Sequence, residues 1–263
     1  MLWHELSWPA LDKVDREIPV VIPLGSCEQH GRHLPVFVDS IQVTAIAEQV
    51  EKKMSRKILL TPTLWLGSSH HHRDFPSIIS LPPSLYTQMI QQVATCILDI
   101  GFRRIFFLNG HGGNETPGSQ ALTELVNLND QANDAYLVFA SWWKLGSDAL
   151  APAKHGMKTE NLSHACEYET SFTLFLRPDL VKLAEARDTP PVIDNKWFSS
   201  ERLSGKVAVF RRFSRFTAAG NYGKPSAATA EKGRAMFEGI VGEVGAFLKD
   251  FAAWPALPQL GPK

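Results

Sequence analysis

The chain has 263 residues, a length that fits one large α/β domain. Basic and acidic residues number 27 each, so no net positive charge favours binding to nucleic acid or to an anionic membrane. Three cysteines without paired spacing argue against a disulfide framework and favour a reducing compartment. We therefore expect a single domain over 1–263 with a small-molecule partner, no nucleic acid and no membrane.

The first residues and the apolar runs bear on location. Residues 1–6 do not show a basic segment followed by an apolar one, so we expect no secretory signal. No apolar run approaches the ~20 residues that are needed to span a bilayer. Together with the cysteine usage, these features predict a cytoplasmic protein.

Short apolar runs rich in β-branched residues predict buried strands at 20–24, 58–61, 105–108 and 136–139. Helical patterns follow them at 40–54, 84–100 and 115–128, the middle one with Ser84 as its cap, and a capped amphipathic helix is expected from about Thr229 to Lys249. This alternation predicts a three-layer α/β fold, with a mostly parallel sheet and helices on both faces. Such sheets bind ligands beyond the carboxyl ends of their strands.

The stretch from Arg187 to Lys224 is less regular and holds a basic cluster at Arg211, Arg212 and Arg215. We call it the 187–224 segment. A loop over an active-site mouth and an oligomer contact are both compatible with its composition.

Metal-capable side chains gather in three short parts of the chain, the first of which follows the first strand. Glu28 and His30 are two apart, so an extended backbone would turn them to the same side, although exposed loops often carry such pairs. Asp39 precedes a helical pattern, where a carboxylate could cap the helix or bridge two cations.

The second and third parts are 109–114 and 164–169. His111 stands among three glycines just after a strand, which leaves backbone room for a ligand or an ion, and the segment lacks the ending of a phosphate-binding loop. Glu167 and Glu169 precede a helical run and would point to different faces, so only one of them is expected to be a ligand. Imidazole and carboxylate donors suit zinc, and open positions can activate water, so the sequence predicts a metal-assisted hydrolase.

A cysteine nucleophile is the competing chemistry. Cys27 and Cys166 adjoin the candidate site, and His164 could act as their base. This alternative leaves the group formed by Glu28, His30 and the other metal-capable residues unexplained. In the metal hydrolase, His164 could instead deliver a proton to the leaving nitrogen, or it could be a structural histidine.

Taken in order, these motifs resemble the creatininase (creatinine amidohydrolase) family. The resemblance covers nearly the full chain and is carried by 23–35 with Asp39, 67–69, 75–76, 79–81, 109–114, 164–171, 223–225 and 228–233. It implies a single-domain α/β fold, two divalent ions (zinc or, alternatively, manganese) and, commonly, a homohexamer. It also implies one metal on Glu28, Asp39 and His111 and a second on His30, Asp39 and Glu169, with His164 and Glu169 as catalytic residues.

Substrate contacts are expected from Ser69, His72, Gly112 and Trp142, although Trp142 could equally pack in the core. The triple histidine at 70–72 could line the pocket, bind an adventitious metal or be a polar loop. Gly112 and Gly113 replace the Tyr-Glu pair of creatininase, so we expect a substrate other than creatinine. We predict hydrolysis of a non-peptide C–N bond in a small cyclic or formyl-type amide by a metal-activated bridging hydroxide. The alternatives are a catalytically silent oligomeric binding protein and a family peptidase that trims a modified peptide.

Overall fold

The computed structural model describes every residue except 202–203, 259 and 262–263. Its centre is a parallel sheet in the order β2-β1-β3-β4. The strands are β1 (Val20–Leu24), β2 (Leu59–Leu60), β3 (Arg104–Asn109) and β4 (Tyr136–Ser141). Leu24 at the end of β1 lies opposite Asn109 at the end of β3, so the loops after both strands leave the same edge.

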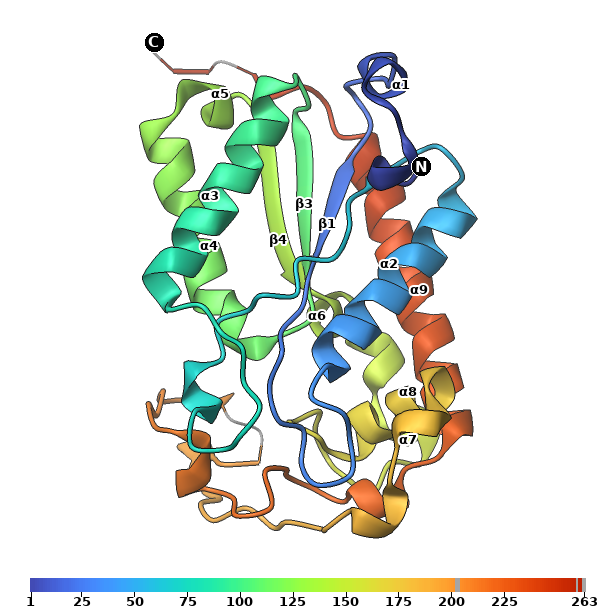
Figure 1. Cartoon of the computed structure of the whole chain (residues 1–263), viewed down its shortest axis with the longest axis vertical. Helices are drawn as coiled ribbons and strands as arrows, with labels where there is room; N and C mark the ends of the chain where they lie inside the picture. Colours follow the sequence, from blue (N-terminus) through green and yellow to red (C-terminus); the bar gives the residue numbers. More distant parts are fainter. Residues whose placement is uncertain (202–203, 259, 262–263) are drawn as a thin grey trace.

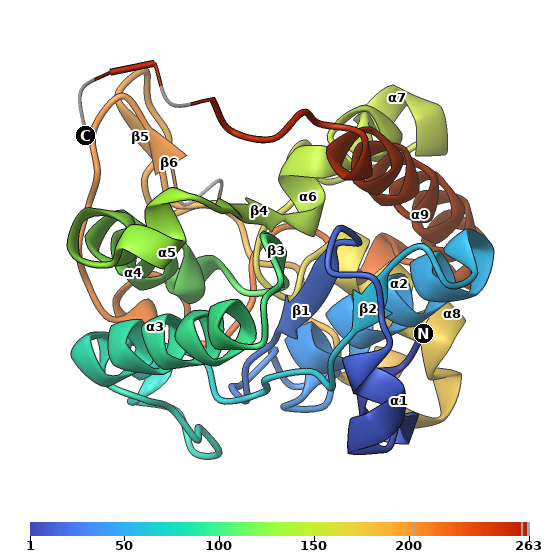
Figure 2. The same ribbon diagram turned by 90° about the horizontal axis from the view of Figure 1, so that it is seen from above.

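Helices cover both faces of this sheet, as Figure 2 shows from above. On one face, Val21 and Phe106 pack against α2 (Val38–Met54) and α9 (Ala230–Ala252), with α8 (Glu167–Leu176) beside them. On the other face, Ile22 and Phe107 pack against α3 (Pro83–Asp99) and α4 (Glu115–Leu128). Alternate residues of each strand therefore point into different cores, which confirms the three-layer α/β prediction.

The remaining short elements sit at the ends of these layers. They are α1 (Trp8–Asp12), α5 (Asp130–Asn133), α6 (Trp142–Leu145), α7 (Pro152–His155) and the antiparallel pair β5 (Phe198–Ser199) and β6 (Ser204–Gly205). The 187–224 segment runs in orange past the carboxyl ends of the strands, at the lower end of Figure 1. Among the described residues, no helix is both long and apolar enough to cross a membrane.

The helix boundaries agree with the sequence to within a few residues, but one cap is wrong. Helix α3 begins at Pro83 after Pro82, and the Ser84 side chain does not cap it. Proline stabilises a first turn because its missing N–H would have no partner there and its backbone angle is already helical. At α9 the predicted cap is confirmed, since Thr229 accepts a hydrogen bond from the backbone N–H of Lys232 at 3.3 Å.

Helix α9 crosses α8 at Gly233, where a Cβ atom would overlap the carbonyl of Ser171. We expect Gly233→Ala to lower the free energy of unfolding by about 1–3 kcal/mol, the usual cost of overpacking. Gly242→Ala on the same helix is the control, because a Cβ there meets no atom within 4 Å. The control should stabilise the helix by roughly 0.5–1 kcal/mol. Denaturant unfolding of the two variants measures both values, and equal stability would contradict the close crossing.

Candidate metal centre

The candidate metal-binding side chains come from the loops beyond β1 and β3 and from the starts of two helices. Glu28 and His30 follow β1, and His111 follows β3. Asp39 is the second residue of α2, and Glu169 is in the first turn of α8. The parallel register of β1 and β3 therefore brings these distant parts of the sequence to one edge of the sheet.

Asp39 lies at the middle of the cluster and is buried. Its Oδ1 is 3.1 Å from Nε2 of His30, and its Oδ2 is 3.0 Å from Nδ1 of His111. The hydroxyl of Ser26 donates a further hydrogen bond to Oδ2. Each oxygen of this carboxylate thus faces a different histidine, which is the arrangement expected of a bridging ligand.

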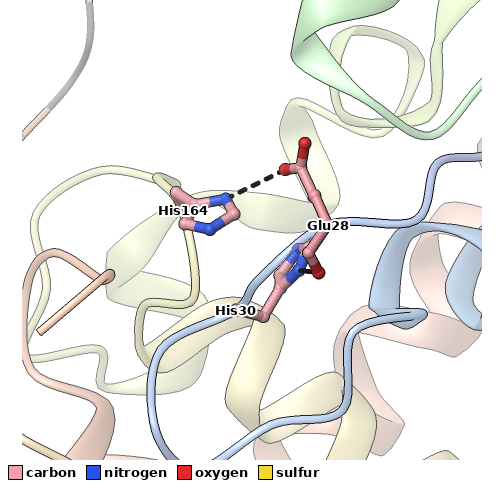
Figure 3. A group of neighbouring side chains, drawn as sticks. All are labelled: Glu28, His30 and His164. Carbon is pink, nitrogen blue, oxygen red and sulfur yellow. Dashed lines mark hydrogen bonds and ion pairs between the residues drawn. The ribbon is translucent and has the colours of Figure 1, made fainter. Parts of the chain in front are cut away.

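Glu28 connects the cluster to a second group of histidines. Its Oε2 is 3.4 Å from Nε2 of His111, while its Oε1 is 3.3 Å from Nε2 of His72 and 3.5 Å from Nδ1 of His164. Figure 3 shows the Glu28 carboxylate and the His164 ring turned toward one another. Within the described residues, Oε2 of Glu28 is a buried atom with no hydrogen-bond partner. The charge that faces this oxygen is that of His111, because a buried carboxylate needs a partner of opposite charge.

Glu169 completes the cluster, whereas Glu167 belongs to another part of the structure. Oε2 of Glu169 lies 3.9 Å from Nε2 of His30 and accepts a hydrogen bond from the backbone N–H of Ala165. Glu167 accepts from the backbone N–H groups of residues 158 and 159 and pairs with Nζ of Lys232 at 2.6 Å. The two glutamates therefore face different neighbours, as their spacing on a helix predicts.

Donor atoms of three residue groups converge closely enough to share a cation. The groups are Glu28, His30 and His164; Glu28, His71 and His111; and His30, Asp39 and Glu169. The third is the second predicted metal set. In the first predicted set, Glu28 and Asp39 contact opposite nitrogens of His111, so the three side chains touch but do not gather on one nitrogen.

Burial and close neighbours shift the protonation of the cluster. Burial raises the pKa of Glu28 and that of Glu169 to about 7 each. Burial opposes the charge on the histidines, but the neighbouring carboxylates raise the pKa of His30 to about 10 and that of His111 to about 9. The pKa of Asp39 is held well below its usual range, because the adjacent histidines outweigh the effect of burial. The carboxylates therefore favour protonated imidazoles at His30 and His111 near neutral pH.

The four predicted substrate-contact residues lie in different surroundings. The hydroxyl of Ser69 is 3.2 Å from Nε2 of His111, and His72 contacts Glu28 as described. Gly112 is exposed, and a Cβ there would meet nothing within 4 Å. Trp142 is buried in the core against Phe172, so its contacts are those of core packing.

Gly113, next to it, is surrounded closely by other atoms. A Cβ at Gly113 would overlap the carbonyl of Ser68 and the ring of His111, and it would come within 2.7 Å of Cε1 of His71. The backbone therefore approaches the His111 ring in a way that only glycine allows.

The structure gives no support to a cysteine nucleophile. Burial raises the pKa of the Cys27 thiol, and it raises the pKa of Cys166 to about 12. The thiolate is the reactive form, so such thiols are poor nucleophiles near neutral pH.

Three residues near the cluster were not assigned contacts from the sequence. His71 stacks on His111 with ring centroids 5.6 Å apart. Nε2 of Gln29 lies 2.9 Å from Nδ1 of His72 and donates to the carbonyl of Gly220 at 2.9 Å. Gln29 has a sequence signal, since it stands between Glu28 and His30.

The third of these residues is Phe213, in the 187–224 segment. Its ring packs against His72 at 4.2 Å and against His164 at 4.7 Å between centroids. At Phe213 the segment therefore packs over the cluster, which favours the first of the two alternatives, a loop over an active-site mouth. No local pattern marks Phe213, because its partners lie far away in the sequence.

The fold and the cluster together define an α/β protein with a buried group of carboxylates and imidazoles at the carboxyl edge of a parallel sheet. A family model described as creatininase, creatinine amidohydrolase, matches residues 4–248. The chain belongs to the creatininase family.

Relatives in this family are named for different activities. The mycofactocin precursor peptide peptidase of Mycobacterium tuberculosis (strain CDC 1551 / Oshkosh) is 31% identical over 256 residues, covering 91% of this chain and 87% of the relative. The creatinine amidohydrolase of Pseudomonas putida is 29% identical over 201 residues, covering 71% of this chain and 76% of the relative.

Solved structures show the same fold. A crystal structure of creatinine amidohydrolase (creatininase) superposes with a TM-score of 0.80 at 24% identity, covering 95% of this chain and 96% of the other. Other solved creatininases at 24% identity are described as a manganese form and as a Zn-Zn type.

The pKa shifts predict how metal binding depends on pH. His30 and His111 have raised pKa values, so both hold a proton at pH 7.5 and must lose it when a cation binds. Apparent metal affinity should therefore rise with pH up to about 9–10, with about two protons released per chain at pH 7.5.

Calorimetry of zinc binding in buffers of different ionisation enthalpy measures this release. His155→Asn is the control, because His155 bonds the carbonyl of Ala149 and belongs to none of the three donor groups. Binding without any proton release would contradict the predicted role of the two histidines as ligands.

Proposed function

We propose that this protein is an amidohydrolase that uses two divalent metal ions, zinc or manganese, to hydrolyse a C–N bond in a small cyclic or formyl-type amide. The observation that carries the proposal is the row of close contacts at the sheet edge that links Glu28 to His111, His111 to Asp39 and Asp39 to His30, with Glu169 beside His30. Oε2 of Glu28 is left without a hydrogen-bond partner there among the described residues. The donor set fits divalent cations that accept nitrogen and oxygen ligands.

Under this proposal, Glu28, Asp39 and His111 would hold one ion and His30, Asp39 and Glu169 the other. Bound ions would supply an activated water and would polarise the carbonyl of the substrate. The surrounding residues orient these ligands, since Ser26 donates to Asp39 and the backbone N–H of Ala165 donates to Glu169. Such supporting bonds commonly fix the direction of metal ligands.

His164 is proposed to move the proton that the reaction requires. Its Nε2 is 2.8 Å from the carbonyl of Gln29, which can only accept a hydrogen bond, and 3.0 Å from the side-chain Nε2 of the same residue, which can only donate one. Burial holds the pKa of His164 well below its usual range, so the ring is neutral near pH 7. The proposed role uses the tautomer that bonds the carbonyl, with its proton on Nε2. Nδ1 faces Glu28 and is placed to take a proton from the attacking water and pass it to the leaving nitrogen.

A peptide amide is the second candidate substrate. The peptidase from Mycobacterium tuberculosis is similar over most of both chains, more than the creatinine amidohydrolase is. This likeness favours a peptide bond as the bond that is cleaved, with the same residues in the same proposed roles. A catalytically silent binding protein remains the alternative of another class, and the intact donor set argues against it.

We also propose that the protein is a single domain over 1–263 and a homo-oligomer, a hexamer as likeness to the family implies. Its proposed partner is a small-molecule amide, and its proposed location is the cytoplasm. Ser69, His72 and Gly112 are proposed to contact the substrate.

Asp39→Ala tests the metal assignment. We expect metal content, measured by elemental analysis of the untagged protein, to fall from about two equivalents to below one, because both proposed sites lose a shared ligand. Hydrolysis should fall by more than about 100-fold, the upper range for changes that only disturb supporting bonds.

The substrates for this comparison are a cyclic amide, a formamide and a peptide, so the same screen separates the two candidate functions. Asp179→Ala is the control, because Asp179 is an exposed partner of Arg177. Full metal content and full activity in Asp39→Ala would show that the bridging assignment is wrong. Substoichiometric metal that cannot be restored, with no hydrolysis in the wild type, would favour the silent binding protein.

His164→Asn tests the proton transfer. We expect kcat to fall by about 10²–10⁴-fold on an alkyl amide while the metal content stays unchanged. On a nitroanilide substrate the fall in kcat should be much smaller, because the nitroaniline leaving group can depart without being protonated. Loss of metal from His164→Asn would instead identify His164 as a ligand, which its donor group with Glu28 and His30 also permits.

A further inference from the structure

Three arginines of the 187–224 segment surround a cavity beside the candidate metal centre. The cavity has a volume of about 660 Å³ and is lined by Asp74, Arg211, Arg212, Ser214 and Arg215. Three guanidinium groups and one carboxylate give its wall a formal charge of about +2 at neutral pH. This charge is local, since the whole chain has no net charge.

Phe213 links the stretch of chain that lines the cavity to the metal centre. Phe213 stands between two of the cavity residues in sequence, and its ring packs on His72 and His164 of the cluster. On the other side of the cluster, His71 stacks on His111, and Asp74 of the cavity wall follows three residues later in the same loop. Figure 1 shows the loop that follows β2, in teal, meeting the orange segment at this end of the molecule.

Asp74 does not neutralise all of this charge. Its Oδ1 pairs with Nη1 of Arg212 at 2.7 Å, and its Oδ2 accepts a hydrogen bond from the hydroxyl of Ser214. One oxygen of Asp74 therefore pairs with Arg212 and the other with Ser214, so neither pairs with Arg211 or Arg215. These bonds also anchor the segment on the loop that carries Asp74.

The other two arginines have free hydrogen-bonding capacity. Nε and Nη2 of Arg211 are buried atoms without a hydrogen bond of good geometry in the described part of the chain, and the polar group nearest to the guanidinium is the buried hydroxyl of Tyr222. The flat face of its guanidinium lies over Phe216, with Cζ 4.8 Å from the ring centre, so a ligand would bind at the edge of the group, beside Tyr222. The exposed Arg215 has no ion pair with any described residue. A solvated surface cluster would not hold donors away from both water and acceptors.

We propose that this cavity binds a carboxylate group of the substrate while the amide to be cleaved lies at the metal centre. The inference rests on the proposed amidohydrolase function and specifies its substrate class as amides that carry a carboxylate. The edge of a guanidinium offers two parallel N–H groups that match the two oxygens of a carboxylate. Arg211 and Arg215 are the binding residues, and Arg212 with Asp74 fixes the position of the segment.

Matched pairs of substrates test this directly. Each pair differs only in a carboxylate or a carboxamide: N-formylglycine and its amide, 5-oxoproline and its amide, and a peptide with a free or an amidated C-terminus. For the pair that the metal-loaded protein hydrolyses, we expect kcat/KM to be at least about tenfold higher for the carboxylate, mainly through KM.

The double variant Arg211→Gln/Arg215→Gln should bring this ratio to within about twofold of one. The matched control Arg177→Gln/Arg187→Gln removes two exposed arginines outside the cavity wall and should keep the wild-type ratio. A substrate carboxylate that binds directly to a metal ion would raise the ratio by the same factor in the wild type and in both variants. Only the part of the ratio that is lost in the double variant therefore tests the arginines. A wild-type ratio near one, or a preference that survives in the double variant, would overturn the proposal.

Binding separates this proposal from the proposed function. Calorimetry of the metal-loaded protein with the same pairs detects a preference for the carboxylate whether or not the amide is cleaved. An arginine-dependent preference without hydrolysis supports the cavity and counts against the amidohydrolase, whereas hydrolysis without such a preference does the reverse. If the double variant does not fold, Arg215→Glu at the exposed position should lower the ratio below the wild-type value, and an unchanged ratio would overturn the proposal.

Discussion

The contacts of the Asp39 carboxylate are the interaction on which the rest of the candidate site depends. Its two oxygens face His30 and His111, which arrive from the loops after β1 and β3, and Ser26 holds it from the first of these loops. The carboxylate stands at the start of α2, where a negative charge is favourable. One side chain therefore ties the two central strands to a helix on one face of the sheet, and its burial makes those partners necessary.

The sequence predicted what local periodicity and residue chemistry can encode. Strand β3 and helix α9 follow from their apolar patterns, and Glu28, His30 and His111 stand out because polar metal-capable residues directly follow apolar strands. Phe213 could not be found in this way, since its place against His72 depends on the path of a long irregular segment. The predicted Ser84 cap failed because the helix begins one residue earlier, at Pro83, so Ser84 lies inside the first turn and not before it.

The 187–224 segment gives the site its cover and its local charge. Phe213 closes over the imidazoles, and the arginines on either side of it face a cavity of their own. An apolar cover keeps water from the histidines and strengthens electrostatic interactions beneath it. Phe213 and the arginines beside it thus affect both the exposure of the histidines to water and the charge that an approaching molecule meets.

The two adjacent glycines after His111 differ in how they connect the loops around the site. A Cβ at position 112 would meet free space, whereas one at 113 would overlap the carbonyl of Ser68 and the rings of His71 and His111. Gly113 therefore sets the spacing between the loop after β3 and the triple-histidine loop at 70–72. A side chain at 112 would change the surface beside the site without moving either loop, whereas any side chain at 113 would have to push the two loops apart.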